Sequence, residues 1–366
     1  MNTKIGRVQI IAEIGTAHNG NIERAKQLID AAKKAGADWA KFQIVYAHEI
    51  LHPNTGTVNL PGGAIRLFDR FKELEVAPSF YKEIKEYCDS VQIGFLCSPF
   101  GIRSARELHS LSPKYIKIAS PELNHFPLLK EVASYGLPLI LSTGVSLLCD
   151  IEKALFITKN APERILLHCI TQYPAPVSEY NLSLIENLSR IFGVKTGISD
   201  HSMDPVLVPV LSAACGACMI EKHICLSRQD SGLDDPVALP PDLFAQMVSA
   251  VRATEGQSKE TVISDMKITF GQEEIEKILG DGVKRLADSE KDNYLRTNRS
   301  LHFMDSYKMG EVIDETKIDI LRTEKILNPG ISPEFYEDVL GAVLTRGVSS
   351  GEGVSWEDLI PNQRLV

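Results

Sequence analysis

Short apolar segments alternate with amphipathic helical segments from the N-terminus to Thr254. Val8–Ile14 is apolar and short, which predicts a strand, and Ile22–Ala35 carries apolar residues at helical spacing with Gly36 as a C-terminal cap. The same pair of elements is predicted seven more times: Trp39–Ile44 with Ser79–Ser90, Ile93–Cys97 with Ile102–Ser110, Tyr115–Ile118 with Pro127–Tyr135, Leu137–Leu141 with Ile151–Lys159, Ile165–His168 with Leu182–Ile191, Lys195–Ile198 with Pro205–Ala214, and Cys218–Lys222 with Pro241–Thr254.

Strands that alternate with helices pair in parallel, because each helix returns the chain to the starting end of the sheet. Eight such units fit a closed (β/α)8 TIM barrel. A doubly wound open sheet is the alternative, but no Gly-x-Gly-x-x-Gly follows the first predicted strand, which weakens a dinucleotide-binding interpretation. We therefore predict an α/β protein whose TIM barrel spans residues 1–280.

The pattern changes after Thr254. Residues 257–277 are polar and charged, with one helix expected near Glu273–Leu279. Residues 281–294 are predicted to be a linker, and 295–366 a small β-rich second domain. A domain of that size has little core of its own, so we expect it to pack on another surface.

Composition narrows the functional classes. The 366 residues are 44% hydrophobic, enough for a large core, and the net charge of −9 argues against general nucleic-acid binding. There is no apolar run long enough to span a membrane, and Glu13 interrupts the first one, so we predict a cytoplasmic protein without a signal peptide. The odd number of cysteines, seven, indicates reduced thiols. For Cys215 and Cys218 we favour reduced core thiols over zinc ligands, with a redox pair as the minor alternative.

Polar residues gather where the predicted strands end. In a barrel of this kind the carboxyl ends of the strands carry the chemistry, so these side chains should converge at one mouth. In strand order they are Glu13; Lys41 and Gln43; Ser98; Lys117, Ser120 and Glu122; Ser142 and Thr143; His168, Thr171 and Tyr173; Ser199, Asp200 and His201; and Glu221, Lys222 and His223.

Two lysines predict an anionic substrate. Lys41 and Lys117 would lie inside a mostly apolar barrel, where a lysine needs a nearby anion to stay charged. Hydroxyl donors follow on other strands, and together they favour a site for phosphate or for phosphate plus carboxylate. We call these residues the anion site: Lys41, Lys117, Ser120, Ser142 and Ser199. The alternative is that the lysines pair with Glu13 or Glu122 in a structural network.

His201 and His223 follow adjacent predicted strands and could meet across the mouth. Two imidazoles with open positions suit a divalent ion such as Mn²⁺, Co²⁺ or Zn²⁺, with substrate or water completing its ligands. One of them could instead serve only as a hydrogen-bonding group.

Motifs along the whole chain carry a family resemblance. They are IIAEIGTAHNG, AGADWAKFQ, FLCSPF, YIKIASPE, LILSTG, LLHCITQYPAP, GISDHS and IEKH, followed by RSLHF and LRTEKILNPGISPEFYEDVLG. In these motifs and their order the chain resembles the sialic acid synthase (N-acetylneuraminate synthase) family. Its tail is similar to the antifreeze-like (SAF) domain of those enzymes.

The resemblance implies a reaction. Family members join phosphoenolpyruvate to an N-acylated mannosamine-type aldehyde, releasing phosphate and forming a nine-carbon 2-keto acid. They need a divalent metal, commonly Mn²⁺, and work as domain-swapped homodimers in which the SAF domain of one chain covers the barrel of the other.

Roles transfer by motif. Carried over in this way, the anion site (Lys41, Lys117, Ser120, Ser142, Ser199) would bind phosphoenolpyruvate, His201 and His223 would bind the metal, and Arg322 would reach the sugar from the partner chain. Facing the sugar or the attacking water would be Glu13, Gln43, Glu122, Tyr173 and Asp234, and catalysis is expected from Glu13, Glu122 and Lys117.

Three departures from the family motifs lie where the sugar should bind: the segment 47–68, Ile170–Tyr173, and Gly232–Asp235 in place of the usual G-P-D-H. They leave open a synthase for legionaminic- or pseudaminic-type acids. A different phosphoenolpyruvate-dependent keto-acid synthase or aldolase is a further candidate, and so is a non-catalytic barrel with a carbohydrate- or ice-binding tail. For Arg322, a surface pairing with Glu324 is the competing interpretation.

Overall fold

The computed structural model describes residues 4–60, 63–324 and 326–360; the predicted domains also include residues outside these ranges. Eight parallel strands form one sheet in the order β5-β2-β1-β10-β9-β8-β7-β6, and the end strands β5 and β6 lie side by side, so the sheet is a nearly closed barrel. This confirms the predicted TIM-like fold. The strands are β1 (Gln9–Gly15), β2 (Trp39–Ile44), β5 (Gly94–Pro99), β6 (Ile116–Ile118), β7 (Leu139–Ser142), β8 (Arg164–Cys169), β9 (Lys195–Asp200) and β10 (Met219–His223).

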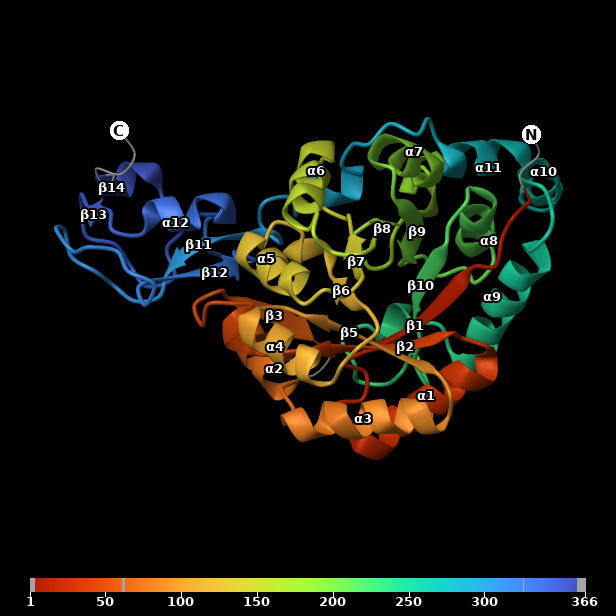
Figure 1. Ribbon diagram of the computed structural model, residues 1–366, viewed down its shortest axis with the longest axis horizontal. Helices are drawn as coiled ribbons and strands as arrows, with labels where there is room; N and C mark the ends of the chain where they lie inside the picture. Colours follow the sequence, from red (N-terminus) through yellow and green to blue (C-terminus); the bar gives the residue numbers. More distant parts are fainter. Residues whose placement is uncertain (1–3, 61–62, 325, 361–366) are drawn as a thin grey trace.

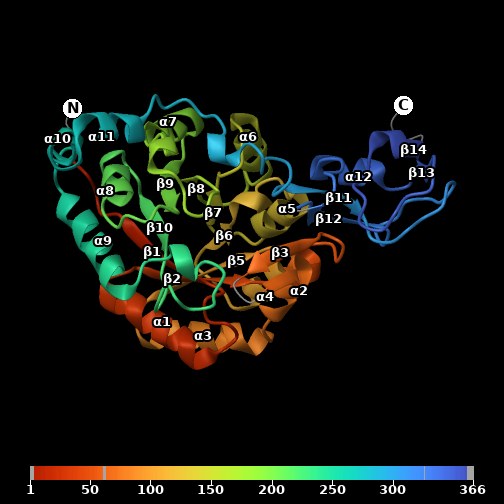
Figure 2. The same cartoon turned by 180° about the vertical axis from the view of Figure 1, so that it is seen from behind.

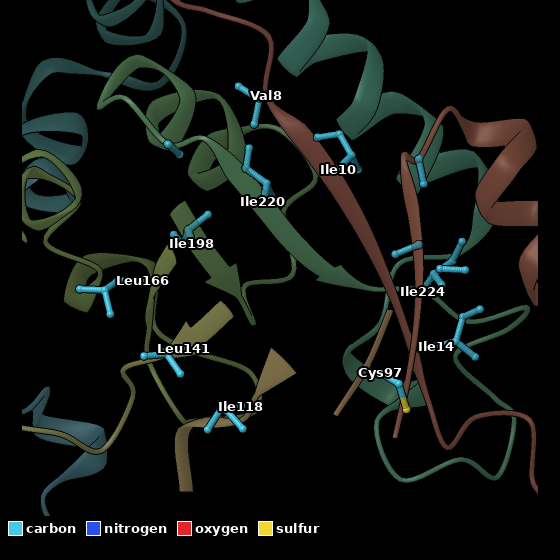
Figure 3. Close-up of a cluster of buried hydrophobic side chains, with 14 of the residues drawn as sticks. Val8, Ile10, Ile14, Cys97, Ile118, Leu141, Leu166, Ile198, Ile220 and Ile224 are labelled. Carbon is cyan, nitrogen blue, oxygen red and sulfur yellow. The ribbon is translucent and has the colours of Figure 1, made fainter. Parts of the chain in front are cut away.

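Helices cover the outside of the barrel (Figure 1). The outward side chains of the strands pack beneath them in one large apolar layer. Figure 3 shows part of it, from Val8 just before β1 and Ile10 on β1 to Ile220 on β10. The covering helices are α1 (Ile22–Ala35), α3 (Pro78–Ser90), α4 (Ile102–Ser110), α5 (Phe126–Ser134), α6 (Leu148–Ile157), α7 (Ser183–Phe192), α8 (Leu207–Ala214) and α9 (Pro241–Thr254).

The inward side chains form a second, smaller apolar cluster in the lower barrel: Ile11, Leu96, Ile140, Ile165, Leu167 and Met219. Because side chains alternate along a strand, the next inward position toward the carboxyl end lies two residues later. On β1 and β10 these next positions are Glu13 and Glu221, so the interior changes from apolar to charged at the upper end.

Two regions contain elements that the sequence pattern did not predict. The segment after β2 forms a hairpin, β3 (Thr57–Leu60) with β4 (Gly63–Arg66), followed by α2 (Leu67–Glu73). The polar segment 257–277 forms α10 (Lys259–Phe270) ahead of α11 (Gln272–Leu279), where one helix was expected.

The C-terminal domain has its own small core around Leu301, Phe303 and Ile320. It projects from one side of the barrel, beside α5, in both views (Figures 1 and 2). Its elements are β11 (Arg299–Phe303) paired with β12 (Ile318–Arg322), α12 (Tyr336–Val339), and β13 (Val343–Leu344) paired with β14 (Leu359–Ile360). Within the described ranges, none of the helices has the length and apolar character needed to cross a bilayer.

Candidate active site

A cavity of about 230 Å³ lies at the carboxyl ends of the barrel strands. The structure brings together in its lining most of the residues predicted from the sequence. They are Glu13, Lys41, Gln43, Lys117, Ser120, Ser142, Tyr173, Ser199, His201, His223, Asp234 and Arg322.

Strand register explains this convergence. Glu13 on β1 is level with Lys41 on β2 and with His223 on β10, so three strands present these side chains at one height. On β10, Glu221 is level with Ser199 of β9. The side chains of Glu13, Lys41 and Glu221 are at most 5% exposed, so their charges face one another rather than water.

These charges form one buried network. Lys41 Nζ donates to Glu13 Oε2 at 2.6 Å and lies 3.7 Å from Glu221 Oε2. Lys117 Nζ and Ser199 Oγ both donate to Glu221 Oε1, at 3.3 and 2.9 Å. The predicted pairing of a lysine with Glu13 therefore exists. Glu221, to which the sequence pattern assigned no role beyond a place at the mouth, joins the two lysines.

The network shifts the ionisation of its members. Burial raises the pKa of Glu13 to about 7, although Lys41 opposes the shift. Burial alone would raise the pKa of Glu221, but Lys117 and Lys41 outweigh it and bring that pKa to about 2. Burial lowers the pKa of Lys117. Glu13 is thus the group of this network that can exchange a proton near neutral pH.

Hydroxyl groups lie on the opposite wall of the cavity. Ser120 Oγ accepts a hydrogen bond from the backbone N–H of Gly144 at 3.0 Å. A Cβ at residue 144 would lie 2.0 Å from Thr171 Oγ1 and 2.9 Å from Ser120 Oγ, so only glycine fits there. Ser142 Oγ is buried and has no partner among the described residues, which leaves it able to donate to a ligand.

The two predicted metal ligands face each other. The His201 and His223 rings have centroids 5.5 Å apart, and Tyr173 stacks on His201 at 4.1 Å. His201 Nδ1 donates to the Ile170 carbonyl at 2.7 Å, so Nε2 is the ring nitrogen that can bind a metal when the ring is neutral. Asp234 Oδ2 lies 3.7 Å from His223 Nδ1.

This pair fits a divalent ion held by two protein ligands. Burial keeps the pKa of His223 well below its ordinary value, so the ring is neutral and can coordinate. Burial would also lower the pKa of His201, but the neighbouring Cys169 outweighs it and raises that pKa to about 8. The described residues contain no group of three side chains suited to hold a metal, so substrate or water would have to complete the ligands.

Glu122 differs from its predicted place. It is fully buried outside the cavity lining, and Arg299 and Arg322 both donate to its Oε1, at 2.9 and 2.7 Å. The short 3₁₀ turn Ser120–Glu122 after β6 directs this side chain toward the C-terminal domain. Glu122 therefore holds the two arginines in place instead of facing a substrate, and Arg299 was missed from the sequence.

Arg322 reaches the cavity from the C-terminal domain of the same chain. Its backbone N–H donates to the Ile50 carbonyl, and its guanidinium pairs with Glu122 rather than with Glu324. It also lies over the Phe100 ring, 5.4 Å from the centroid. Within one chain, the arginine therefore completes the mouth of its own barrel.

Two further expectations are settled by side-chain direction. His168 was expected at the mouth, but it points outward from β8 and donates from Nε2 to the Tyr180 carbonyl at 2.5 Å. Cys215 and Cys218 are free thiols at the lower end of β10, and burial raises the pKa of each to about 11. His223 lies at the upper end of that strand, so the three do not form a zinc site.

Comparison with known proteins identifies the family. The model of the NeuB family matches residues 28–262, and that of the SAF domain matches 298–360. The N,N'-diacetyllegionaminic acid synthase of Campylobacter jejuni is 32% identical over 351 residues, which cover 94% of this chain and 97% of that protein.

Solved structures agree. The spore coat polysaccharide biosynthesis protein SpsE of Bacillus subtilis is 31% identical with a TM-score of 0.81 and covers 97% of both chains. The N-acetylneuraminic acid (sialic acid) synthetase of Leptospira borgpetersenii, solved with citrate, is 30% identical with a TM-score of 0.62, covering 80% of this chain and 90% of that one. The chain belongs to the NeuB family of sialic-type acid synthases and ends in a SAF domain.

Proposed function

We propose that this phosphoenolpyruvate-dependent synthase condenses phosphoenolpyruvate with an N-acylated mannosamine-type aldehyde, giving a nine-carbon 2-keto acid and phosphate. The observation that carries the proposal is the convergence of two buried lysines and three serine hydroxyls beside a histidine pair in one cavity. Phosphoenolpyruvate combines a phosphate and a carboxylate, and the anion site offers charged and neutral donors for both.

The charges of the network can rearrange when the anion enters. Lys41 pairs with Glu13, and Lys117 pairs with Glu221. A bound phosphate attracts both lysines and weakens their pairing with the two carboxylates, while Glu13, with a pKa of about 7, stays ionised at and above neutral pH and can still accept a proton. Ser142, which has no partner among the described residues, donates to the incoming anion.

The reaction then follows from positions in the cavity. C3 of phosphoenolpyruvate bonds to the aldehyde carbon, and C2 gains positive character next to the carboxylates of Glu13 and Glu221. Water adds to C2 and gives its proton to Glu13, which lines the cavity whereas Glu122 does not. Glu13 passes this proton to the oxygen of the former aldehyde, which becomes a hydroxyl. The C2–O bond to phosphate breaks with its electron pair on the phosphate oxygen, which takes the proton of the remaining C2 hydroxyl as that hydroxyl becomes the ketone. The lysines and serines bind the released hydrogen phosphate.

His201 and His223 would hold a divalent metal, most simply Mn²⁺, which would supply Lewis-acid activation of the aldehyde oxygen. We expect chelation to lower phosphate release by at least about 100-fold, and Mn²⁺ to restore it. The affinity for the metal should decrease as the pH is lowered below about 8, because His201 then takes up a proton that competes with the metal. Full turnover after thorough chelation would contradict the metal and leave both histidines as hydrogen-bonding groups.

One wall of the cavity favours a particular kind of acceptor. Beyond the histidines, Phe71, Leu74, Phe100 and Leu233 form an apolar surface beside Arg322. Such a wall suits a methyl group better than a hydroxymethyl group, because a buried hydroxyl without a partner is destabilising. This favours 2,4-diacetamido-6-deoxy acceptors, the sugars that lead to legionaminic- or pseudaminic-type acids.

A phosphate-release screen tests the function and the acceptor together. Wild-type enzyme with phosphoenolpyruvate and Mn²⁺ would be given N-acetylmannosamine, 2,4-diacetamido-6-deoxy hexoses, and short sugar phosphates. Release with an N-acylated sugar supports the proposal, and a higher kcat/KM for a 6-deoxy acceptor supports the role of the apolar wall. Release with the sugar phosphates alone would point to another keto-acid synthase, and no release with any acceptor would favour a non-catalytic barrel.

The resemblance also implies a domain-swapped homodimer, which stays a proposal. A mixture of Arg322→Ala and Lys117→Ala chains tests it, because each variant should be inactive alone. If the arginine acts across subunits, heterodimers should recover activity after subunit exchange, because one site then combines an intact barrel with an intact arginine from the neighbouring chain. No recovery would contradict the swap and mean that the intrachain contact of Arg322 with Glu122 persists in the assembly. Exchange itself is checked with differently tagged chains.

We also propose a cytoplasmic location. All seven cysteines are free, and Cys88, Cys97 and Cys225 are buried with pKa values raised by burial. Unpaired cysteines persist most readily in a reducing compartment.

A further inference from the structure

The segment predicted to be a linker, 281–294, contains a fully buried carboxylate. Glu290 lies in a short 3₁₀ turn (Asp288–Glu290) and has no exposed surface. Its Oε1 accepts hydrogen bonds from the backbone N–H groups of Val145, at 2.8 Å, and Thr171, at 2.7 Å. Burying a carboxylate is unfavourable unless its hydrogen bonds are satisfied, so a simple spacer would not need one. The two backbone donors, on distant segments, indicate a role for Glu290.

The two donors belong to the loops that form one wall of the cavity. Val145 lies in the loop that follows β7, directly after Gly144, and Thr171 lies in the loop that follows β8. Gly144 donates to Ser120 Oγ, and the space at Gly144 is limited by Thr171 Oγ1 and Ser120 Oγ. Glu290 itself does not line the cavity. It therefore joins the β7 and β8 loops from behind, on the side away from any substrate.

The backbone at Val145 needs this link. Val145 has φ of 41°, a left-handed conformation that is unfavourable for a β-branched residue. Its N–H is held by Glu290, and its carbonyl accepts from Asn298 Nδ2 at 3.1 Å. Both polar backbone groups of this strained residue are thus bound by the segment that leads into the C-terminal domain. Lys284 Nζ adds a third contact to the same loop, donating to the Thr143 carbonyl at 3.1 Å.

We propose that Glu290 is a positioning residue for phosphoenolpyruvate binding. It fixes the spacing of the β7 and β8 loops so that Ser120, Ser142 and Thr171 point at the same anion. The β7 loop is also tied to the C-terminal domain. Glu290 and Asn298 bind the two sides of Val145, and Asn298 immediately precedes β11, so the position of that domain affects the shape of the anion site. The inference rests on the proposed function, since it assigns the anion site to phosphoenolpyruvate.

The test uses the full-length chain with Glu290→Ala and Glu290→Gln. The matched control is Asp288→Asn on the same turn, because the side chain of Asp288 is exposed and pairs with the exposed Lys291. We expect Glu290→Ala to raise the KM for phosphoenolpyruvate at least about tenfold, with a much smaller change in the KM for the acceptor sugar. Glu290→Gln keeps an acceptor oxygen and should recover part of the loss. Calorimetric titration with phosphoenolpyruvate alone should show the same order of affinities.

A structural readout separates positioning from general destabilisation. Amide hydrogen exchange should rise at Val145 and Thr171 in Glu290→Ala and stay unchanged in the helices far from the linker, such as α1. If Glu290→Ala does not fold, Asn298→Ala takes its place in the test. This variant removes the hydrogen bond to the Val145 carbonyl, and we expect the same increase in the KM for phosphoenolpyruvate. An unchanged KM and affinity for phosphoenolpyruvate in a folded variant overturns this inference alone. A wild type that neither binds phosphoenolpyruvate nor releases phosphate overturns the proposed function as well.

Discussion

Replacing Lys117 with alanine should lower kcat/KM for phosphoenolpyruvate by at least about 1,000-fold, roughly 4 kcal/mol of lost transition-state stabilisation. Lys117 is fully buried on β6, and among the described residues its one salt-bridge partner is Glu221, at 3.3 Å. Without it, Lys41 is the one lysine left in the described lining of the cavity beside the carboxylates of Glu221 and Glu13. An incoming phosphate would then meet net negative charge in a site with little water to screen it.

The measurement is initial-rate phosphate release at saturating acceptor, with thermal unfolding to show that the variant folds. Lys114→Ala is the matched control, because Lys114 is exposed just before β6, at the opposite end of the barrel. It should keep wild-type kinetics. A Lys117→Ala enzyme within about tenfold of the wild-type kcat/KM would remove Lys117 from the anion site.

The barrel was predictable because its elements are strongly periodic. The elements that were missed have weak patterns for identifiable reasons. Helix α10 buries only Val262 and Met266, so its charged sequence shows almost no apolar face. Helix α2 has no fully buried residue, yet its Phe71 reaches the cavity lining. The positions of such helices depend on the distant residues that they pack against, so the sequence of the helix alone does not predict them.

The site was predictable as far as the strands continue. Counting by two from Ile11 places Glu13 inside, and the same count on β8 places Leu167 and Cys169 inside and His168 outside. The prediction for His168 failed because it assumed that the last residue of the predicted strand points into the barrel. The alternation of inward and outward side chains along β8 places it outside. Glu122 lies beyond β6, in a 3₁₀ turn where the alternation no longer applies. Its two arginine partners lie 177 and 200 residues later, in the C-terminal domain, which no local pattern could reveal.

Glu13→Gln should lower kcat by about 1,000-fold and remove a pH dependence that the wild type shows near neutrality. Burial raises the pKa of Glu13 to about 7. As the base that takes the proton from water, Glu13 must be ionised, so wild-type activity should rise as pH increases through about 7 and level off above it. Glutamine keeps the hydrogen bond with Gln43 but cannot accept that proton, and it leaves Lys41 without its 2.6 Å partner.

The pH profile of kcat/KM, measured with saturating Mn²⁺, separates Glu13 from the other candidate. His201, whose pKa is raised to about 8, could also give a limb in this range, and it is untouched by the substitution. Loss of the limb in Glu13→Gln assigns it to Glu13. A variant that keeps both the limb and most of its kcat would show that another group activates the water. Glu23→Gln, on the exposed face of α1, is the matched control, and its profile should overlay that of the wild type because that carboxylate lies in solvent, far from the cavity.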